Sequence, residues 1–209
     1  MTPSMPVSPR VRMAEHGPAA LSDVELLAVL LRTGRVGAPA TKMASAMLEG
    51  AGGLAELMYA ANVSAEILVV MELSKRAAAQ QLRQRDVFGS PDAVKNYLQL
   101  HLARKPCEEF AVLFLDAQNR LIEMRVLFHG TLTQTSVYPR EIVAAALDIG
   151  AAAVVLAHNH PSGTVQPSRA DEALTQTLKA ALALVDVRVL DHIIVAPGQA
   201  LSMAEKGLL

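Results

Sequence analysis

The sequence predicts an α/β domain with a mixed sheet flanked by helices, preceded by a small all-α N-terminal domain. Helical patterns fill the chain as far as residue 85, whereas strand-like apolar runs alternate with helical stretches over residues 86–209. Such alternation is typical of a layered α/β fold whose sheet contains parallel and antiparallel strands. The composition changes at Asp86-Val87-Phe88-Gly89, so the predicted domains span residues 1–85 and 86–209.

The first domain is expected to be helical after an extended arm. Residues 1–17 carry prolines among polar residues, which favours an extended conformation. Ser22-Asp23-Val24-Glu25 has the pattern of a capping box that opens a helix, and Gly34 is its expected end. Further helical segments are predicted over 40–48, 54–60 and 65–85.

The second domain is predicted to alternate helices and strands. Ser90-Pro91 supplies an N-cap and a first-turn proline for a helix that ends near Leu102. Strands over 109–117 and 120–128 form a predicted hairpin around Gln118-Asn119. The remaining predicted elements are a helix over 139–149, a strand before His158, a helix over 168–184 and a strand over 187–195.

Composition excludes several classes of function. The net charge of −1 gives no general electrostatic case for a polyanionic partner, and the absence of Trp argues against stacking platforms for single-stranded nucleic acid. Cys107 is the only cysteine, so an intrachain disulfide is impossible. Residues 1–12 lack the apolar region of a signal peptide, and no apolar run reaches membrane-spanning length. We expect a soluble cytoplasmic protein with no membrane partner.

Two histidines follow a short apolar run that has strand character. His158 and His160 come directly after residues 151–157, and alternate side chains of a strand point the same way. Two imidazoles on one face supply two metal ligands, and an Asp from the next element could be the third. Three such ligands with one open position are what a catalytic zinc requires.

The segment after these histidines is open to two interpretations. Asp171 could be the third ligand, but Ser168-x-x-Asp171 also has the pattern of a helix start with Ser168 as N-cap. The spacing by itself leaves both open.

A metal-activated water also needs a base, and Glu108 and Glu109 stand at the start of the predicted hairpin. One of these acids must point toward each face of the strand. Adjacent acids at a strand start are ordinarily solvated, so the residues alone leave a structural role open.

The spacing of these residues resembles a known signature. The chain contains His158-x-His160-Pro161 and then Ser168-x-x-Asp171, with seven residues between His160 and Ser168. This pattern is similar to the JAMM motif of JAB/MPN metalloproteases. With Pro139-Arg140-Glu141-Ile142-Val143, Pro161-Ser162-Gly163 and Leu190-Asp191-His192, residues 86–209 resemble the bacterial RadC family, UPF0758-like proteins included. The resemblance implies a JAB/MPN (cytidine-deaminase-like) fold.

The resemblance also implies a role for each matching residue. His158, His160 and Asp171 would bind Zn²⁺, Glu108 would be the general acid/base with Glu109 as the fallback, and Ser168 would hydrogen-bond the oxyanion. The implied reaction is zinc-dependent hydrolysis of a peptide or isopeptide amide, with a protein or peptide as substrate. We interpret His192 as a packed or edge residue, with a supporting role at the site as the alternative.

The N-terminal domain resembles RadC too, through Gly17-Pro18 to Leu27. In that family the region ends in a helix-hairpin-helix whose Gly-x-Gly turn could hold a DNA phosphate. Residues 63–76 contain no glycine, so the hairpin is degenerate here and DNA binding is disfavoured. The alternative function is a non-catalytic RadC-like DNA-repair accessory or a protein- or DNA-binding module. The complete set of candidate ligands, with an available Glu, favours the hydrolase. Asn159 or Ser162 could orient the loop by hydrogen bonding, but we assign both to turn formation.

Overall fold

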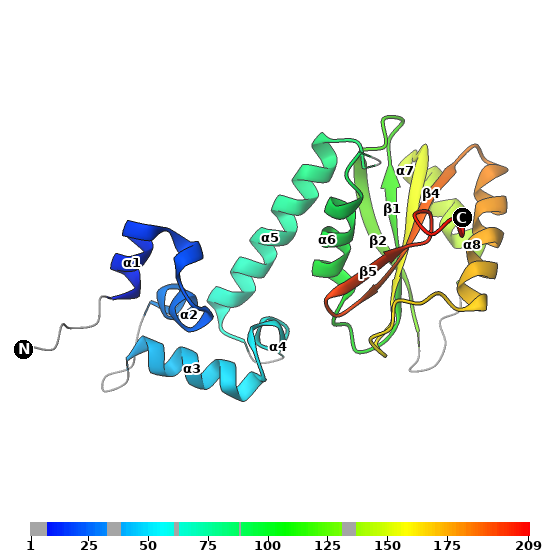
Figure 1. Ribbon diagram of the computed structural model, residues 1–209. Coiled ribbons are helices and arrows are strands. Elements are labelled where there is room, and N and C mark those ends of the chain that lie inside the picture. Colours follow the sequence, from blue (N-terminus) through cyan, green and yellow to red (C-terminus); the bar gives the residue numbers. More distant parts are fainter. Residues whose placement is uncertain (1–7, 33–38, 61–62, 88, 131–136) are drawn as a thin grey trace, which may run out of the picture. The chain divides into compact units, whose positions relative to one another are not determined.

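The structure is a computed structural model that describes residues 8–32, 39–60, 63–87, 89–130 and 137–209 (Figure 1). The chain divides into two compact units, Met1–Leu73 and Ser74–Leu209, and the division falls inside helix α5 (Ala65–Gln84). Among the described helices, none is both long enough and apolar enough to cross a membrane.

The N-terminal unit is helical, as predicted. It contains α1 (Pro9–His16), the 3₁₀ turn η1 (Pro18–Ala20), α2 (Asp23–Leu31), α3 (Ala40–Ala51), α4 (Leu54–Met58) and the start of α5. The predicted capping box at α2 is present, since the Ser22 hydroxyl accepts from Glu25 N–H while the Glu25 carboxylate accepts from Ser22 N–H. Five buried apolar side chains form its core: Leu27, Ala28, Ala44, Leu57 and Ile67.

The expected extended arm is wrong for the part of it that the structure describes. Pro9 occupies the first turn of α1 with Ser8 as N-cap, a position where proline favours a helix because no N–H is needed there. The guanidinium of Arg12 then bonds the Glu25 carboxylate and the Ala20 carbonyl. The expected stop at Gly34 lies outside the described residues.

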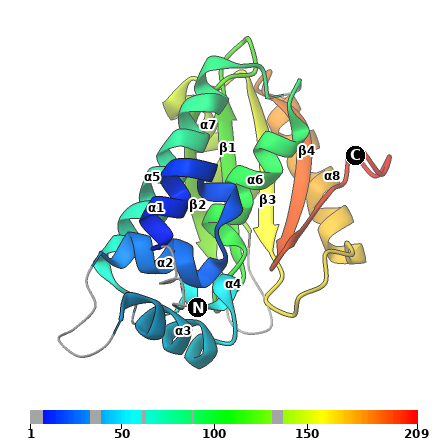
Figure 2. The ribbon, with the colours of Figure 1, turned by 60° about the vertical axis from the view of Figure 1, so that its left-hand side comes forward.

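The C-terminal unit contains a mixed sheet of five described strands between two helical layers. The mixed sheet with flanking helices was predicted, whereas the fifth strand was not. The strands are β1 (Glu109–Leu115), β2 (Leu121–His129), β3 (Ala153–Asn159), β4 (Arg188–Ala196) and β5 (Gln199–Ser202), in the order β2-β1-β3-β4-β5. Of the described strands, only β3 and β4 pair in parallel. Helix α6 (Pro91–Leu102) covers one face, and α7 (Pro139–Ile149) and α8 (Arg169–Ala183) cover the other (Figures 1 and 2).

Strand register decides which side chains share a face. Phe110 of β1 stands opposite His158 of β3, and Leu156 of β3 stands opposite His192 of β4. Side chains at alternate positions and in direct register point the same way. The face under α7 and α8 therefore carries Phe110, His158 and His192, while Ala157 packs on the face under α6.

Candidate metal centre

The structure brings His158, His160 and Asp171 together at the end of β3. His158 is in the strand, His160 follows its last residue, and Asp171 is in the first turn of α8. The Nε2 atoms of His158 and His160 are 2.9 Å apart, and Asp171 Oδ1 is 3.3 Å from Nε2 of His158. One ligand atom from each residue lies within 4.8 Å of the others, an arrangement that can hold a metal ion.

The hydrogen bond at the far side of the His160 ring shows which nitrogen can act as a ligand. Nδ1 of His160 is 2.9 Å from the carbonyl oxygen of Thr164. A carbonyl only accepts, so Nδ1 carries the proton and Nε2 presents its lone pair toward His158. Two ring nitrogens at 2.9 Å need a proton or a cation between them. This donor set of two imidazoles and one carboxylate fits a zinc ion with three protein ligands.

Asp171 serves the helix and the cluster at once. Its Oδ2 accepts hydrogen bonds from the backbone N–H and the hydroxyl of Ser168, and the Ser168 hydroxyl accepts from Asp171 N–H. Oδ1, the other oxygen, lies toward His158. The two interpretations left open by the spacing are therefore compatible, since one oxygen completes the capping box while the other lies in the cluster.

The cluster is buried on one side and reachable on the other. The side chain of His158 is only 1 % exposed, whereas those of His160 and Asp171 are 16 % and 14 % exposed. Burial lowers the pKa of His158 to about 4, although the nearby Asp171 carboxylate acts in the opposite direction. The His158 imidazole is therefore neutral at pH 7, the form that binds a metal.

Glu108 and Glu109 point to opposite faces of the sheet. Glu109 is buried, with its carboxylate 3.2 Å from Lys105 Nζ and 3.5 Å from His129 Nδ1. The β1–β2 ladder continues one residue further, because Gly130 N–H donates to the carbonyl of Glu108. Glu108 precedes Phe110 by two residues, so the same alternation directs its side chain to the face of His158. This placement favours Glu108 over Glu109 as the candidate base.

Asn159 fixes the backbone on both sides of Glu108. Its Oδ1 accepts from Glu109 N–H at 2.8 Å, and its Nδ2 donates to the carbonyl of Cys107 at 3.1 Å. Asn159 is the last residue of β3 and is fully buried, so its assignment to turn formation is wrong. The sequence could not reveal this contact because it depends on the β1–β3 register.

His192 lies against the cluster as well. Its Nε2 is 2.8 Å from Nδ1 of His158, and its other ring nitrogen is 2.6 Å from the Thr175 hydroxyl of α8. Burial, and then the nearby His158 and His160, lower the pKa of His192 well below its usual range. The sequence interpretation favoured a packed residue. The one available signal was its place in Leu190-Asp191-His192, and Thr175 carried no signal at all.

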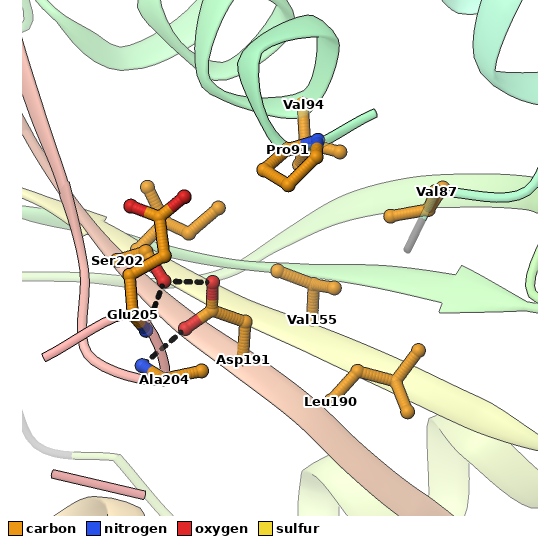
Figure 3. A pocket seen from close by; sticks show the side chains of 10 residues that line it. Val87, Pro91, Val94, Val155, Leu190, Asp191, Ser202, Ala204 and Glu205 are labelled. Carbon is orange, nitrogen blue, oxygen red and sulfur yellow. Dashed lines mark hydrogen bonds between the residues drawn. The ribbon is translucent and has the colours of Figure 1, made fainter. Parts of the chain in front are cut away.

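A cavity of about 310 Å³ on the other face of the sheet is separate from this cluster (Figure 3). Apolar side chains of α6, β3 and β4 form most of its wall, and Asp191 bonds Ser202 and Ala204 N–H beside them. Burial raises the pKa of the Asp191 carboxyl, against the effect of these hydrogen bonds. Asp191 precedes His192 in β4, so the two side chains face opposite ways.

The lowered pKa of His158 makes the metal-free fold sensitive to acid. Between pH 6.5 and about 4 the unfolded chain binds a proton on this residue that the folded chain excludes. Protonation then favours unfolding, so the free energy of unfolding should be largest above pH 6.5. It should fall by about 3 kcal/mol from this residue as the pH decreases to 4. Urea unfolding of metal-free protein across this range measures the effect. His158→Asn should flatten the profile, and an equally steep profile in that variant contradicts the assignment.

Comparison with known proteins places the chain in a family. Residues 88–208 match the RadC-like JAB domain, and residues 5–79 match the UPF0758 N-terminal family. A UPF0758 protein of Albidiferax ferrireducens is 61 % identical over 96 % of this chain and 95 % of its own length. UPF0758 proteins of Acidovorax sp. strain JS42 and Variovorax paradoxus are 60 % and 56 % identical over the same shares. The chain therefore belongs to the UPF0758 family of proteins with a RadC-like JAB domain.

Proposed function

We propose that this protein is a zinc-dependent hydrolase of the JAMM type that cleaves a peptide or isopeptide amide. The observation that carries the proposal is the cluster of His158, His160 and Asp171, whose candidate ligand atoms lie within 4.8 Å of one another. Membership of the JAB family, which includes hydrolases, supports it. Glu108, on the strand face that carries His158, provides the acid/base group that such a reaction needs.

His158 and His160 would hold the zinc through Nε2, and Asp171 through Oδ1. A zinc ion bound there would supply Lewis-acid chemistry, since it polarises a carbonyl oxygen and makes water acidic enough to attack near neutral pH. Three protein ligands leave a further position open, as in catalytic rather than structural zinc sites. The partial exposure of His160 and Asp171 gives a substrate access to that position.

Glu108 would take the proton of the attacking water and deliver it to the departing amine. A carboxylate is suited to both steps because it exchanges a proton near neutral pH once the water has been made acidic. Its backbone is held by the bonds from Asn159 to both neighbours and by the bond from Gly130 N–H. This support fixes the backbone from which the Glu108 carboxylate projects.

Ser168 would donate a hydrogen bond to the oxyanion that forms at the scissile carbonyl. Its hydroxyl proton now bonds Asp171 Oδ2 at 2.6 Å. Rotation of the hydroxyl toward a substrate would leave the bond from Ser168 N–H to the same oxygen in place. The helix cap therefore survives while the hydroxyl serves the reaction.

The first test compares two neighbouring acids that face opposite ways. Zinc-loaded Glu108→Gln should keep its metal and lose cleavage of a peptide and isopeptide library by about 10²- to 10⁴-fold, because the proton carrier is removed. Glu109→Gln is the matched control and should keep both zinc and cleavage. Zinc content by elemental analysis and library turnover by mass spectrometry provide the measurements.

The same preparation tests the ligands. His158→Ala should lose stoichiometric zinc, since one of three ligands is gone. Wild-type protein without stoichiometric zinc after a zinc-supplemented preparation contradicts the proposal. Wild-type protein that binds zinc and cleaves no library member supports instead the non-catalytic binding module.

A second prediction concerns the support of Glu108. Asn159→Ala leaves the N–H of Glu109 and the carbonyl of Cys107 without their buried partner, which should cost about 2–3 kcal/mol of unfolding free energy. It should also lower kcat while zinc affinity stays the same, because the Glu108 backbone shifts and no ligand is altered. Chemical denaturation, zinc titration and library turnover measure the three quantities. The exposed Ser162 of the adjoining loop gives the control Ser162→Ala, expected to match wild type. Weakened zinc binding in Asn159→Ala would count against this role.

A further inference from the structure

A chain of buried polar groups links two of the candidate ligands through the interior of the unit. It begins at Nδ1 of His158, 2.8 Å from Nε2 of His192. It continues from Nδ1 of His192 to the Thr175 hydroxyl at 2.6 Å, and from that hydroxyl to the backbone carbonyl of Asp171 at 2.6 Å. His158, His192 and Thr175 are each at most 1 % exposed, so water does not compete for these bonds.

The last bond of the chain fixes where the protons are. The Asp171 carbonyl can only accept, so a contact of 2.6 Å between it and the Thr175 oxygen requires the hydroxyl proton. Met203 Sδ, at 3.8 Å, is the weaker and more distant acceptor. The hydroxyl has one proton, and that proton is used. The Thr175 oxygen must therefore accept from Nδ1–H of His192.

The proton position on His192 also determines which ring nitrogen of His158 carries a proton. A buried imidazolium needs an anionic partner, and both ring nitrogens of His192 contact neutral groups. A neutral His192 with its proton on Nδ1 presents a lone pair at Nε2, which accepts from Nδ1–H of His158. Nε2 of His158 is then without a proton, and it is this atom that lies beside His160 and Asp171.

We propose that Thr175 and His192 are positioning residues that hold His158 as the Nδ1–H tautomer and so keep its Nε2 free to bind zinc. The inference rests on the proposed zinc site but not on hydrolysis. His160 reaches the same tautomer through the Thr164 carbonyl. His158 lies at the interior end of the cluster and is held in this tautomer by His192 and Thr175, the second of which bonds the backbone carbonyl of Asp171. The ring orientation of His158 is thereby tied to the position of Asp171.

The test uses the full-length protein and two threonines of one helix. Thr175→Val keeps the branched shape but removes the acceptor of His192, which should then place its proton on Nε2 and reverse the bond to His158. Zinc affinity, measured by competition with a chelator, should fall by about 10- to 100-fold. Thr175→Ser should restore it. Thr177 bonds the carbonyl four residues earlier in the same way but is exposed, so Thr177→Val is the matched control and should bind like wild type.

Nitrogen-15 NMR of the histidine rings reads the tautomers directly and needs no variant. In wild-type protein, zinc-loaded and metal-free, His192 should carry its proton on Nδ1, and zinc-loaded His158 should do the same. Thr175→Val should move the His192 proton to Nε2.

A wild-type His192 protonated on Nε2, or a Thr175→Val protein with wild-type zinc affinity, overturns the inference. If wild-type protein binds no zinc, the zinc site itself fails, and the metal-free spectrum still decides the proton order of His192 and Thr175. If zinc binds without cleavage, only the hydrolase proposal fails.

Discussion

The contact between two imidazole nitrogens at 2.9 Å is the constraint around which the C-terminal unit is organised. Two lone pairs would repel at that distance unless a proton or a cation lies between them, and the surrounding structure holds both rings in place. His160 is held by the Thr164 carbonyl and by its own N–H, which donates to the Val195 carbonyl. His158 is held between Phe110, whose ring is nearly parallel to it, and His192. Strands β1, β3 and β4 and the loop after β3 thus hold a close contact that a bound cation would make favourable.

The topology of the sheet explains why the candidate ligands meet where they do. β3 and β4 are parallel, so the chain must cross from the end of one to the start of the other, and α8 makes that crossing. The N-terminus of α8 therefore lies near the carboxyl end of β3, where His158 and His160 are. An Asp in the first turn of that helix arrives beside the histidines, and its charge is also favoured there by the helix dipole. Antiparallel β1 runs the other way, so its start, with Glu108, reaches the same end of β3.

The parts of this arrangement that depend on local sequence could be predicted. Periodicity predicted most of the helices and strands, and spacing pointed to His158 and His160. The family resemblance then pointed to Asp171 and Glu108. What depends on contacts between distant segments could not. Asn159 bonds Glu109 and Cys107, which precede it by 50 and 52 positions, and His192 bonds Thr175, which precedes it by 17 positions. The helix at Pro9–His16 was missed for another reason. The prolines of residues 1–17 were interpreted as favouring an extended chain, although Ser8-Pro9, like Ser90-Pro91, is also a favourable helix start.

The hydrogen bonds around the three candidate ligands bear on how the site forms. His160 has the Thr164 carbonyl, Asp171 has Ser168, and His158 has His192. Each ligand therefore has an orienting partner that is independent of a metal. The sheet beneath them is closed by an apolar core on each face. Small zinc-folded domains differ, because their ligands have few other partners and the chain unfolds without the ion. Here the candidate ligands are oriented by the fold itself, so binding a metal would not have to supply the free energy that orders them.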